Sequence, residues 1–135
     1  ERVYKIAHAT SQNGINWVRN GNTIIPDTLG RDECQAYPTV FQSGGKYHMY
    51  FCYRDAFGFR ANQKSAYKLG YAYSSDLIHW SRNDSLGGIE STTSGWDSEM
   101  QCYPNTFELN GAIYMLYNGN EFGRNGFGLA ILVNN

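Results

Sequence analysis

Ten residues, Asp32-Glu33-Cys34-Gln35-Ala36-Tyr37-Pro38-Thr39-Val40-Phe41, have a second copy downstream, Ser98-Glu99-Met100-Gln101-Cys102-Tyr103-Pro104-Asn105-Thr106-Phe107. Five positions are identical, all at an offset of 66 residues: Glu33, Gln35, Tyr37, Pro38 and Phe41. A spacing kept at five positions indicates two copies of one structural unit. The Glu of each copy is therefore the main lead to function.

The composition favours many short strands over helices. The chain has 135 residues, 41% hydrophobic and 17% charged, which suits one globular domain with one moderate core. Aromatic residues make up 16%, and 15 glycines alternate with them, a mixture typical of strands and tight turns. We expect a single all-β domain over residues 1–135.

The charge and hydropathy argue against two kinds of partner. The net charge of -1, without a local Lys/Arg cluster, gives no field that attracts phosphate backbones, so no nucleic acid is expected. No apolar run approaches the roughly 20 residues that span a bilayer, and no signal peptide is visible, so no membrane is expected. The chain starts at Glu1, so a leader or more of the protein could precede it.

The three cysteines, Cys34, Cys52 and Cys102, lack a Cys-x-x-Cys spacing. An odd number without that spacing argues against a disulfide framework or a zinc knuckle and predicts buried free thiols. Free thiols favour a reducing compartment such as the cytoplasm. His48 and His79 also lack a ligand pattern, so no metal and no cofactor are expected.

Each copy of the repeat continues as a predicted β-hairpin. Residues 37–42 and 46–53 read as strands around a Ser-Gly-Gly turn, and residues 103–108 and 112–118 as strands around a turn that ends in Asn110-Gly111. Both faces of residues 46–53 carry large side chains. The sheet is therefore expected to be covered on both sides.

A second phrase also recurs, with Ala9, Ser11, Ile15 and Trp17 answering residues 63 positions later. Its downstream copy runs from Ala72 to Trp80, as Ala-Tyr-Ser-Ser-Asp-Leu-Ile-His-Trp. A short polar residue at each turn can cap its own backbone. Both tryptophans are expected to pack in the core.

Together the two phrases define a unit of about 65 residues with four antiparallel strands, which predicts a β-propeller blade. The expected divisions are a blade remnant at about 3–19, a full blade at about 35–82 and an incomplete blade at about 101–132. Two blades cannot close a ring, because each end would expose an apolar face. Either the chain is part of a longer propeller, or copies assemble as a homo-oligomer, for example a trimer with six blades.

The phrase from Ala72 to Trp80, followed by Glu99 and Tyr103-Pro104, resembles blades of the five-bladed propeller glycoside hydrolases, notably families 43 and 32. The resemblance implies that the first strand of each blade lines a central channel with catalytic carboxylates at its mouth. Glu33-Cys34 is similar to the Glu-Cys dipeptide of family 32. The Asp-Pro motif of the first blade in these families is absent, which implies that this chain alone is inactive if that blade lies elsewhere.

Glycosidic cleavage requires a pair of carboxyl groups, one acid and one base or nucleophile, about 5 to 10 Å apart. Glu33 is the first candidate for the acid, because desolvation at a channel edge raises a carboxyl pKa. Glu99 or Asp32 would be its partner or would modulate its pKa. The alternative is that a Glu repeated in each blade holds a loop by accepting backbone N–H bonds.

The remaining candidates would bind substrate, and each has a structural alternative. The glutamines could bind sugar hydroxyls or link blades, the Trp could be a sugar platform or anchor its loop, and the arginines could clamp an anionic sugar group or form local ion pairs with Asp55 and Glu121. The full set is Gln35, Tyr37, Gln101, Tyr103, Trp96, Arg54 and Arg124.

These observations favour a carbohydrate-active propeller related to glycoside hydrolases, with carbohydrate as its partner. The alternative is a non-catalytic sugar-binding or assembly module, and a protein-interaction scaffold is a third reading. Whether the protein is an enzyme stays open at this point. Glu33→Gln separates the first two readings, since an enzyme would lose turnover and still bind glycan.

Overall fold

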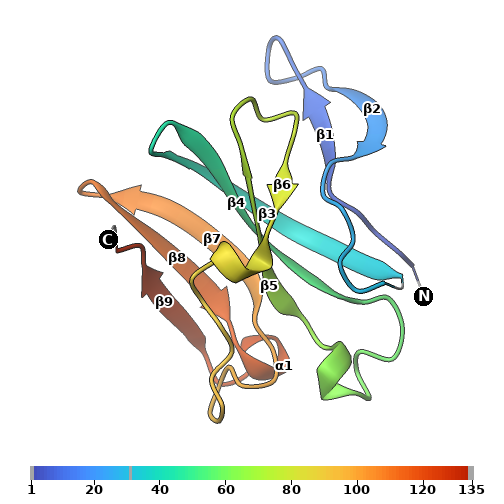
Figure 1. Ribbon diagram of the computed structural model, residues 1–135, viewed down its shortest axis with the longest axis vertical. Helices are drawn as coiled ribbons and strands as arrows, with labels where there is room; N and C mark the ends of the chain where they lie inside the picture. The colour runs from blue at the N-terminus through green and yellow to red at the C-terminus, as the bar shows by residue number, and fades with distance from the viewer. Residues whose placement is uncertain (1, 31, 134–135) are drawn as a thin grey trace.

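The strands lie in three antiparallel sheets, which Figure 1 shows as successive layers along the molecule. The computed structural model describes residues 2–30 and 32–133. Within these residues the sheets have two, four and three strands, and no helix is long and apolar enough to cross a membrane.

The first sheet pairs β1 (Ala7–Thr10) with β2 (Val18–Thr23). The turn between them is held by two polar side chains. Ser11 Oγ accepts the Gly14 N–H at 2.8 Å, and Asn13 Oδ1 accepts the Ile15 N–H at 2.9 Å. Short polar side chains of this kind stabilise a turn by bonding to nearby backbone.

The second sheet has the order β3-β4-β5-β6. Its strands are β3 (Glu33–Ser43), β4 (Lys46–Asp55), β5 (Lys68–Ser74) and β6 (Ser81–Arg82), with the short 3₁₀ helices η1 (Gln63–Ser65) and η2 (Asp84–Leu86) beside them. The predicted hairpin is confirmed. Gly44 and Gly45 both have positive φ at its turn, a conformation that glycine adopts without a steric penalty.

The third sheet has the order β7-β8-β9, from β7 (Cys102–Leu109), β8 (Ala112–Asn118) and β9 (Phe127–Ile131). A single turn, α1 (Asn120–Gly123), joins the last two strands. The second predicted hairpin is also confirmed, with Asn110 and Gly111 at φ 52° and 78°. Two successive positive φ values are those of a type I′ turn, which suits the twist of a two-residue hairpin.

The first strands of the second and third sheets lie side by side. Thr39 of β3 and Thr106 of β7 join them, with their hydroxyls 2.7 Å apart and the Thr106 N–H donating to Thr39 Oγ1 at 3.0 Å. Strands that follow one another from an inner to an outer position, in sheets stacked face to face, form β-propeller blades. The predicted fold class is confirmed: the chain is all-β and forms about two blades of a partial propeller.

Both faces of β4 are covered, as predicted. Met49 and Phe51 pack with Ile6 and Ile25 from the N-terminal segments. On the opposite face Tyr50 packs with buried residues of β5 and β8. Each sheet face is therefore buried by a neighbouring sheet or by the segment that leads to it.

One packing expectation is wrong. The Trp17 side chain is 62% exposed, although its indole N–H donates to Gly14 O just as that of Trp80 donates to Leu77 O. Trp80 is half-buried against the core because a four-stranded sheet lies beside it. Trp17 belongs to the two-stranded sheet, which offers too little surface to cover it. The three free cysteines are buried, as expected.

Candidate functional site

The Glu33 carboxylate is fully buried at the start of β3. One oxygen, Oε2, accepts the backbone N–H groups of Thr28 and Leu29 at 3.0 and 3.3 Å. The other, Oε1, accepts from Gln35 Nε2 at 3.0 Å and from Arg82 Nη1 at 2.6 Å. Both oxygens are thus occupied by groups of the protein itself.

These contacts determine the acidity of Glu33. Burial alone raises its pKa, but the hydrogen bonds from Thr28, Gln35 and Arg82 and the charge of Arg82 outweigh it, so the pKa lies below its ordinary value. The expectation that desolvation raises this pKa is wrong in direction, because the carboxylate is buried with a cation and donors, and not in apolar surroundings. Glu33 stays ionised at neutral pH.

Arg82 makes Glu33 part of a clamp between elements. Its side chain is 1% exposed and reaches from β6, at the outer edge of the sheet, to the start of β3. It also donates to Pro26 O at 2.7 Å and pairs with Asp84 at 2.9 Å. The guanidinium lies over the Tyr53 ring, 4.3 Å from its centroid. The arrangement fastens the segment before β3 to the far strand of the same blade.

In the next blade this position belongs to Asp97, which the sequence comparison did not single out. Asp97 is 2% exposed and accepts from Thr92 Oγ1 at 2.6 Å, Gln101 Nε2 at 3.1 Å and the Tyr117 hydroxyl at 3.1 Å. Burial raises its pKa, but these three donors lower it more. Thr28 precedes Glu33 by five residues just as Thr92 precedes Asp97, so Asp97 is the structural counterpart of Glu33.

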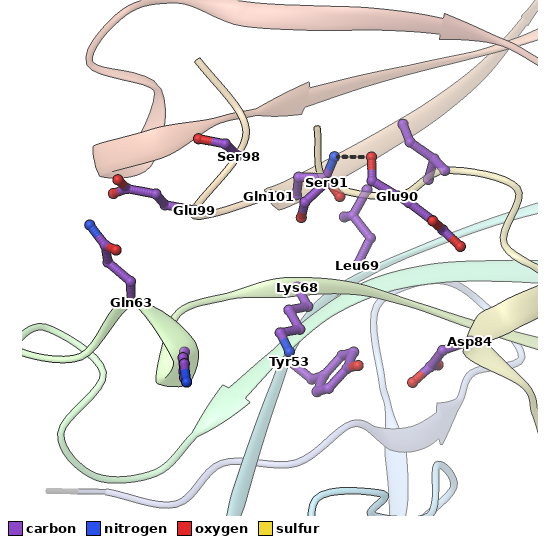
Figure 2. A pocket seen from close by; sticks show the side chains of 12 residues that line it. Tyr53, Gln63, Lys68, Leu69, Asp84, Glu90, Ser91, Ser98, Glu99 and Gln101 are labelled. Carbon is purple, nitrogen blue, oxygen red and sulfur yellow. Dashed lines mark hydrogen bonds between the residues drawn. The ribbon is translucent and has the colours of Figure 1, made fainter. Parts of the chain in front are cut away.

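Glu99 consequently has a different environment from Glu33. Its side chain is exposed, and within the described residues its carboxylate makes no hydrogen bond or ion pair. It lines a pocket of about 500 Å³ between the second and third sheets. Figure 2 shows Glu99 and Gln63 pointing toward each other from opposite walls at one end of this pocket, with Asp84 at the other end.

A second pocket of about 730 Å³ adjoins the first. The two share three residues, Gln63, Lys64 and Glu99, so Glu99 lies where they meet. The walls of the second pocket come from the loop before η1 and from the α1 turn, including Arg60, Glu121 and Phe122. Both volumes are within the range of small-ligand sites. The sequence indicated a lid or contact in the loop after β4 but did not identify this junction.

The other predicted catalytic and charged residues are dispersed. Asp32 is exposed, and its backbone carbonyl accepts the Ala56 N–H at 2.9 Å. Arg54 is buried, donates to the Asp55 and Ala56 carbonyls, and lies 3.6 Å from the Phe59 ring centroid. Arg124 is exposed and pairs with Glu121 at 2.7 Å, the local ion pair given above as the structural alternative.

Both glutamines point into the protein. Gln35 Nε2 donates to Ile25 O at 3.2 Å and to Asp27 Oδ1 at 3.0 Å, and Gln101 Nε2 donates to Glu90 O at 3.2 Å. Each glutamine therefore ties the first strand of its blade to the segment that enters the blade. These contacts match the structural alternative, although Gln101 also lines the first pocket.

The aromatic candidates occupy two places. Tyr37 is 52% exposed on β3, and its ring lies 5.5 Å from that of the half-buried Tyr103 on β7. Trp96 is 37% exposed and lies against Tyr117, with ring centroids 5.3 Å apart. A Cβ added to Gly128 would lie 2.4 Å from the Trp96 indole, so the absence of a side chain on β9 makes room for the ring. Trp96 is thus well fixed, and one edge remains open to solvent.

The fold belongs to the class of propeller-type folds found in glycoside hydrolases. A solved structure described as "Glycoside hydrolase" and one described as a complex of BT0996 and RGII each match with a TM-score of 0.63 at 20% identity, over 94% of this chain and 34% of theirs. An exo-1,5-alpha-L-arabinanase from a bovine ruminal metagenomic library matches with a TM-score of 0.51 at 14% identity, over 82% of this chain and 38% of its own. At these identities the likeness shows the fold alone.

Two curated Mycobacterium tuberculosis proteins are similar in sequence. Uncharacterized protein MT1551 of strain CDC 1551 / Oshkosh and Uncharacterized protein Rv1502 of strain ATCC 25618 / H37Rv are each 37% identical over 135 residues. The match covers 99% of this chain, and the chain spans 42% of the length of these relatives. No family model matches the chain.

Proposed function

We propose that the chain is part of a carbohydrate-active β-propeller of the glycoside hydrolase type, with its site at the two pockets that meet at Glu99. The fold supports this proposal, because its solved neighbours include glycoside hydrolases. The observation that carries it is the exposed Glu99 carboxylate, without a protein partner among the described residues, at the junction of the pockets. Glu33 is less suited to touch a substrate, because both of its oxygens are occupied.

The chemistry of glycoside cleavage suits this position. A ligand that crosses from one pocket to the other places the bond between two sugar units beside Glu99. Glu121 lines the second pocket and supplies another carboxylate, which such a reaction requires. In this proposal Glu99 is the acid or base at the scissile bond, and Glu121 is its partner or binds sugar hydroxyls.

The chain provides only part of such a site. Glycoside hydrolases of this architecture surround the substrate with several blades, and the relatives here are more than twice as long as the match. We propose that these 135 residues alone bind glycan through their two pockets and that hydrolysis needs carboxylates from further blades. Glu33 and Asp32 then have supporting roles, with Glu33 holding the junction between blades.

Binding and hydrolysis of gluco-, xylo- and arabino-oligosaccharides by the 135-residue chain test the proposal. Calorimetry should detect binding, and Glu99→Gln should weaken it about tenfold, because a hydrogen bond to a charged acceptor contributes roughly 1.5 to 3 kcal/mol. The matched control is Glu108→Gln, an exposed glutamate at the other end of β7 that lines neither pocket. Equal affinities of the two variants would move the site elsewhere, and no binding by any form would refute the function.

A second candidate function is assembly, which an exposed apolar face favours. Phe127, Leu129 and Ile131 of β9 are 70%, 56% and 54% exposed and point to one side of the third sheet. The same side of the second sheet is covered by Met115 and Ala130 of the next blade. A further blade is therefore the surface that fits there.

A second copy of this chain fits less well. β1 and β9 both have the position of a third strand in their blades, so joining the two ends of neighbouring copies would place five strands in one blade. The solution mass distinguishes the cases: a monomer agrees with completion by another segment, and a stable trimer would support assembly by copies.

A further inference from the structure

Three aromatic side chains form a row that continues the second pocket toward the first strands of the sheets. Phe122 lines the pocket, and its ring stacks with Tyr103 at a centroid distance of 6.3 Å and an angle of 26°. Tyr103 in turn lies 5.5 Å from Tyr37 on β3. All three rings are at least partly exposed. The row therefore leads from the pocket across β7 to β3.

The backbone of all three residues is strained. Phe122, Tyr103 and Tyr37 have φ values of 60°, 54° and 56°, in the left-handed region that bulky residues rarely adopt. Pro follows each tyrosine, and each Tyr-Pro pair lies in a register shift of its strand. The aromatic residues with positive φ in the described part of the sequence are these three and no others. Strain of this kind costs of order 1–3 kcal/mol per residue and clusters at binding and catalytic sites.

A buried layer holds the row in place from below. Tyr67, 5% exposed, lies 6.1 Å from the rings of both Tyr103 and Phe122. The Tyr67 hydroxyl is hydrogen-bonded to that of Tyr4, which accepts from Arg54 Nη2 at 2.9 Å. Rings fixed by a second layer lose little side-chain entropy when a ligand packs on them, which favours binding.

We propose that Phe122, Tyr103 and Tyr37 form a stacking track for an oligosaccharide that extends from the second pocket toward the axis of the propeller. The apolar C–H faces of pyranose and furanose rings pack on aromatic rings, whereas the sugar hydroxyls remain free to bond at the edges. A track of three rings selects an extended oligosaccharide of several sugar units over a monosaccharide. The inference rests on the proposed function and adds the length of its ligand.

The experiment compares variants that remove a ring and preserve the backbone conformation. Asn tolerates positive φ, so Tyr37→Asn and Phe122→Asn remove rings without adding strain. Leu77→Asn makes the same kind of change at a positive-φ residue in a turn that lines neither pocket, and Tyr37→Phe retains the ring. Calorimetry with arabino-, xylo- and gluco-oligosaccharides of one to six units measures the affinity of each form.

We expect the two ring-removing variants to weaken binding of hexasaccharides by about three- to tenfold and that of disaccharides by less than twofold. Leu77→Asn and Tyr37→Phe should have the affinity of the unmodified chain. Hexasaccharide affinity that is unchanged in both ring-removing variants, while Glu99→Gln still weakens binding, would overturn the track and leave the proposed function standing. Absence of binding to every probe would overturn both.

Discussion

Replacing Glu33 by Gln removes a charge from a fully buried ion pair and should strongly destabilise the fold. The amide nitrogen must face either Arg82 and Gln35 or the N–H groups of Thr28 and Leu29, all of which are donors. Each orientation loses hydrogen bonds and sets donor against donor. Arg82, 1% exposed, would retain only Asp84 as a charged partner.

Breaking one partner of a buried ion pair costs about 3 to 5 kcal/mol. Urea unfolding followed by circular dichroism measures this loss, and with an m-value of about 2 kcal/mol/M the midpoint should fall by about 1.5 M or more. Arg82→Met combined with Glu33→Leu is the matched double variant, because replacing both charges by apolar groups relieves the unpaired charge. It should be more stable than Glu33→Gln.

The pH dependence gives an independent check on the same pair. The pKa of Glu33 in the folded chain is lower than the unfolded value of about 4.3, so its stabilising contribution is complete above that pH and is lost as the pH falls through the folded pKa. Glu33→Gln should flatten this part of the curve. A midpoint shift below about 0.3 M, with an unchanged acid profile, would refute the clamp.

Two further predictions concern the core. Gly70→Ala should destabilise the chain by about 1 to 3 kcal/mol in the same urea assay, because the added Cβ would lie 2.4 Å from the Phe51 ring; a neutral effect would show that the ring has room to move. Burial raises the pKa of the Cys52 thiol to about 11 and that of Cys102 to about 12, so neither should react with a thiol reagent at pH 8 until the chain is unfolded, and fast labelling of the native chain would contradict this.

The repeats were sufficient to predict the fold, because hairpins depend on local sequence. The Ser-Gly-Gly and Asn-Gly turns set the register of both hairpins, and alternating large side chains indicated sheets covered on both faces. The kink in α1 was not predicted, since Glu121 and Phe122 have left-handed backbone in a segment without a glycine at those positions. Tertiary contacts decide such conformations.

The site was harder to predict than the fold, for a reason that Glu33 and Glu99 illustrate. They align in the repeat, yet one is buried beside Arg82 and the other is exposed at a pocket. Side-chain environment depends on residues distant in sequence, and alignment of backbone positions does not report it. The threonine five residues before Glu33 and Asp97 was the available signal for the true counterpart.

The two junctions between sheets also differ in when they can form during synthesis. The clamp at the first junction joins Glu33 to Arg82, 49 residues later, so it closes only after the entire second sheet has left the ribosome. The carboxylate at the second junction, Asp97, takes its donors from within 20 residues on either side. A growing polypeptide therefore completes the first junction late and the second soon after its hairpin emerges, which sets the order in which the blades become fixed to one another.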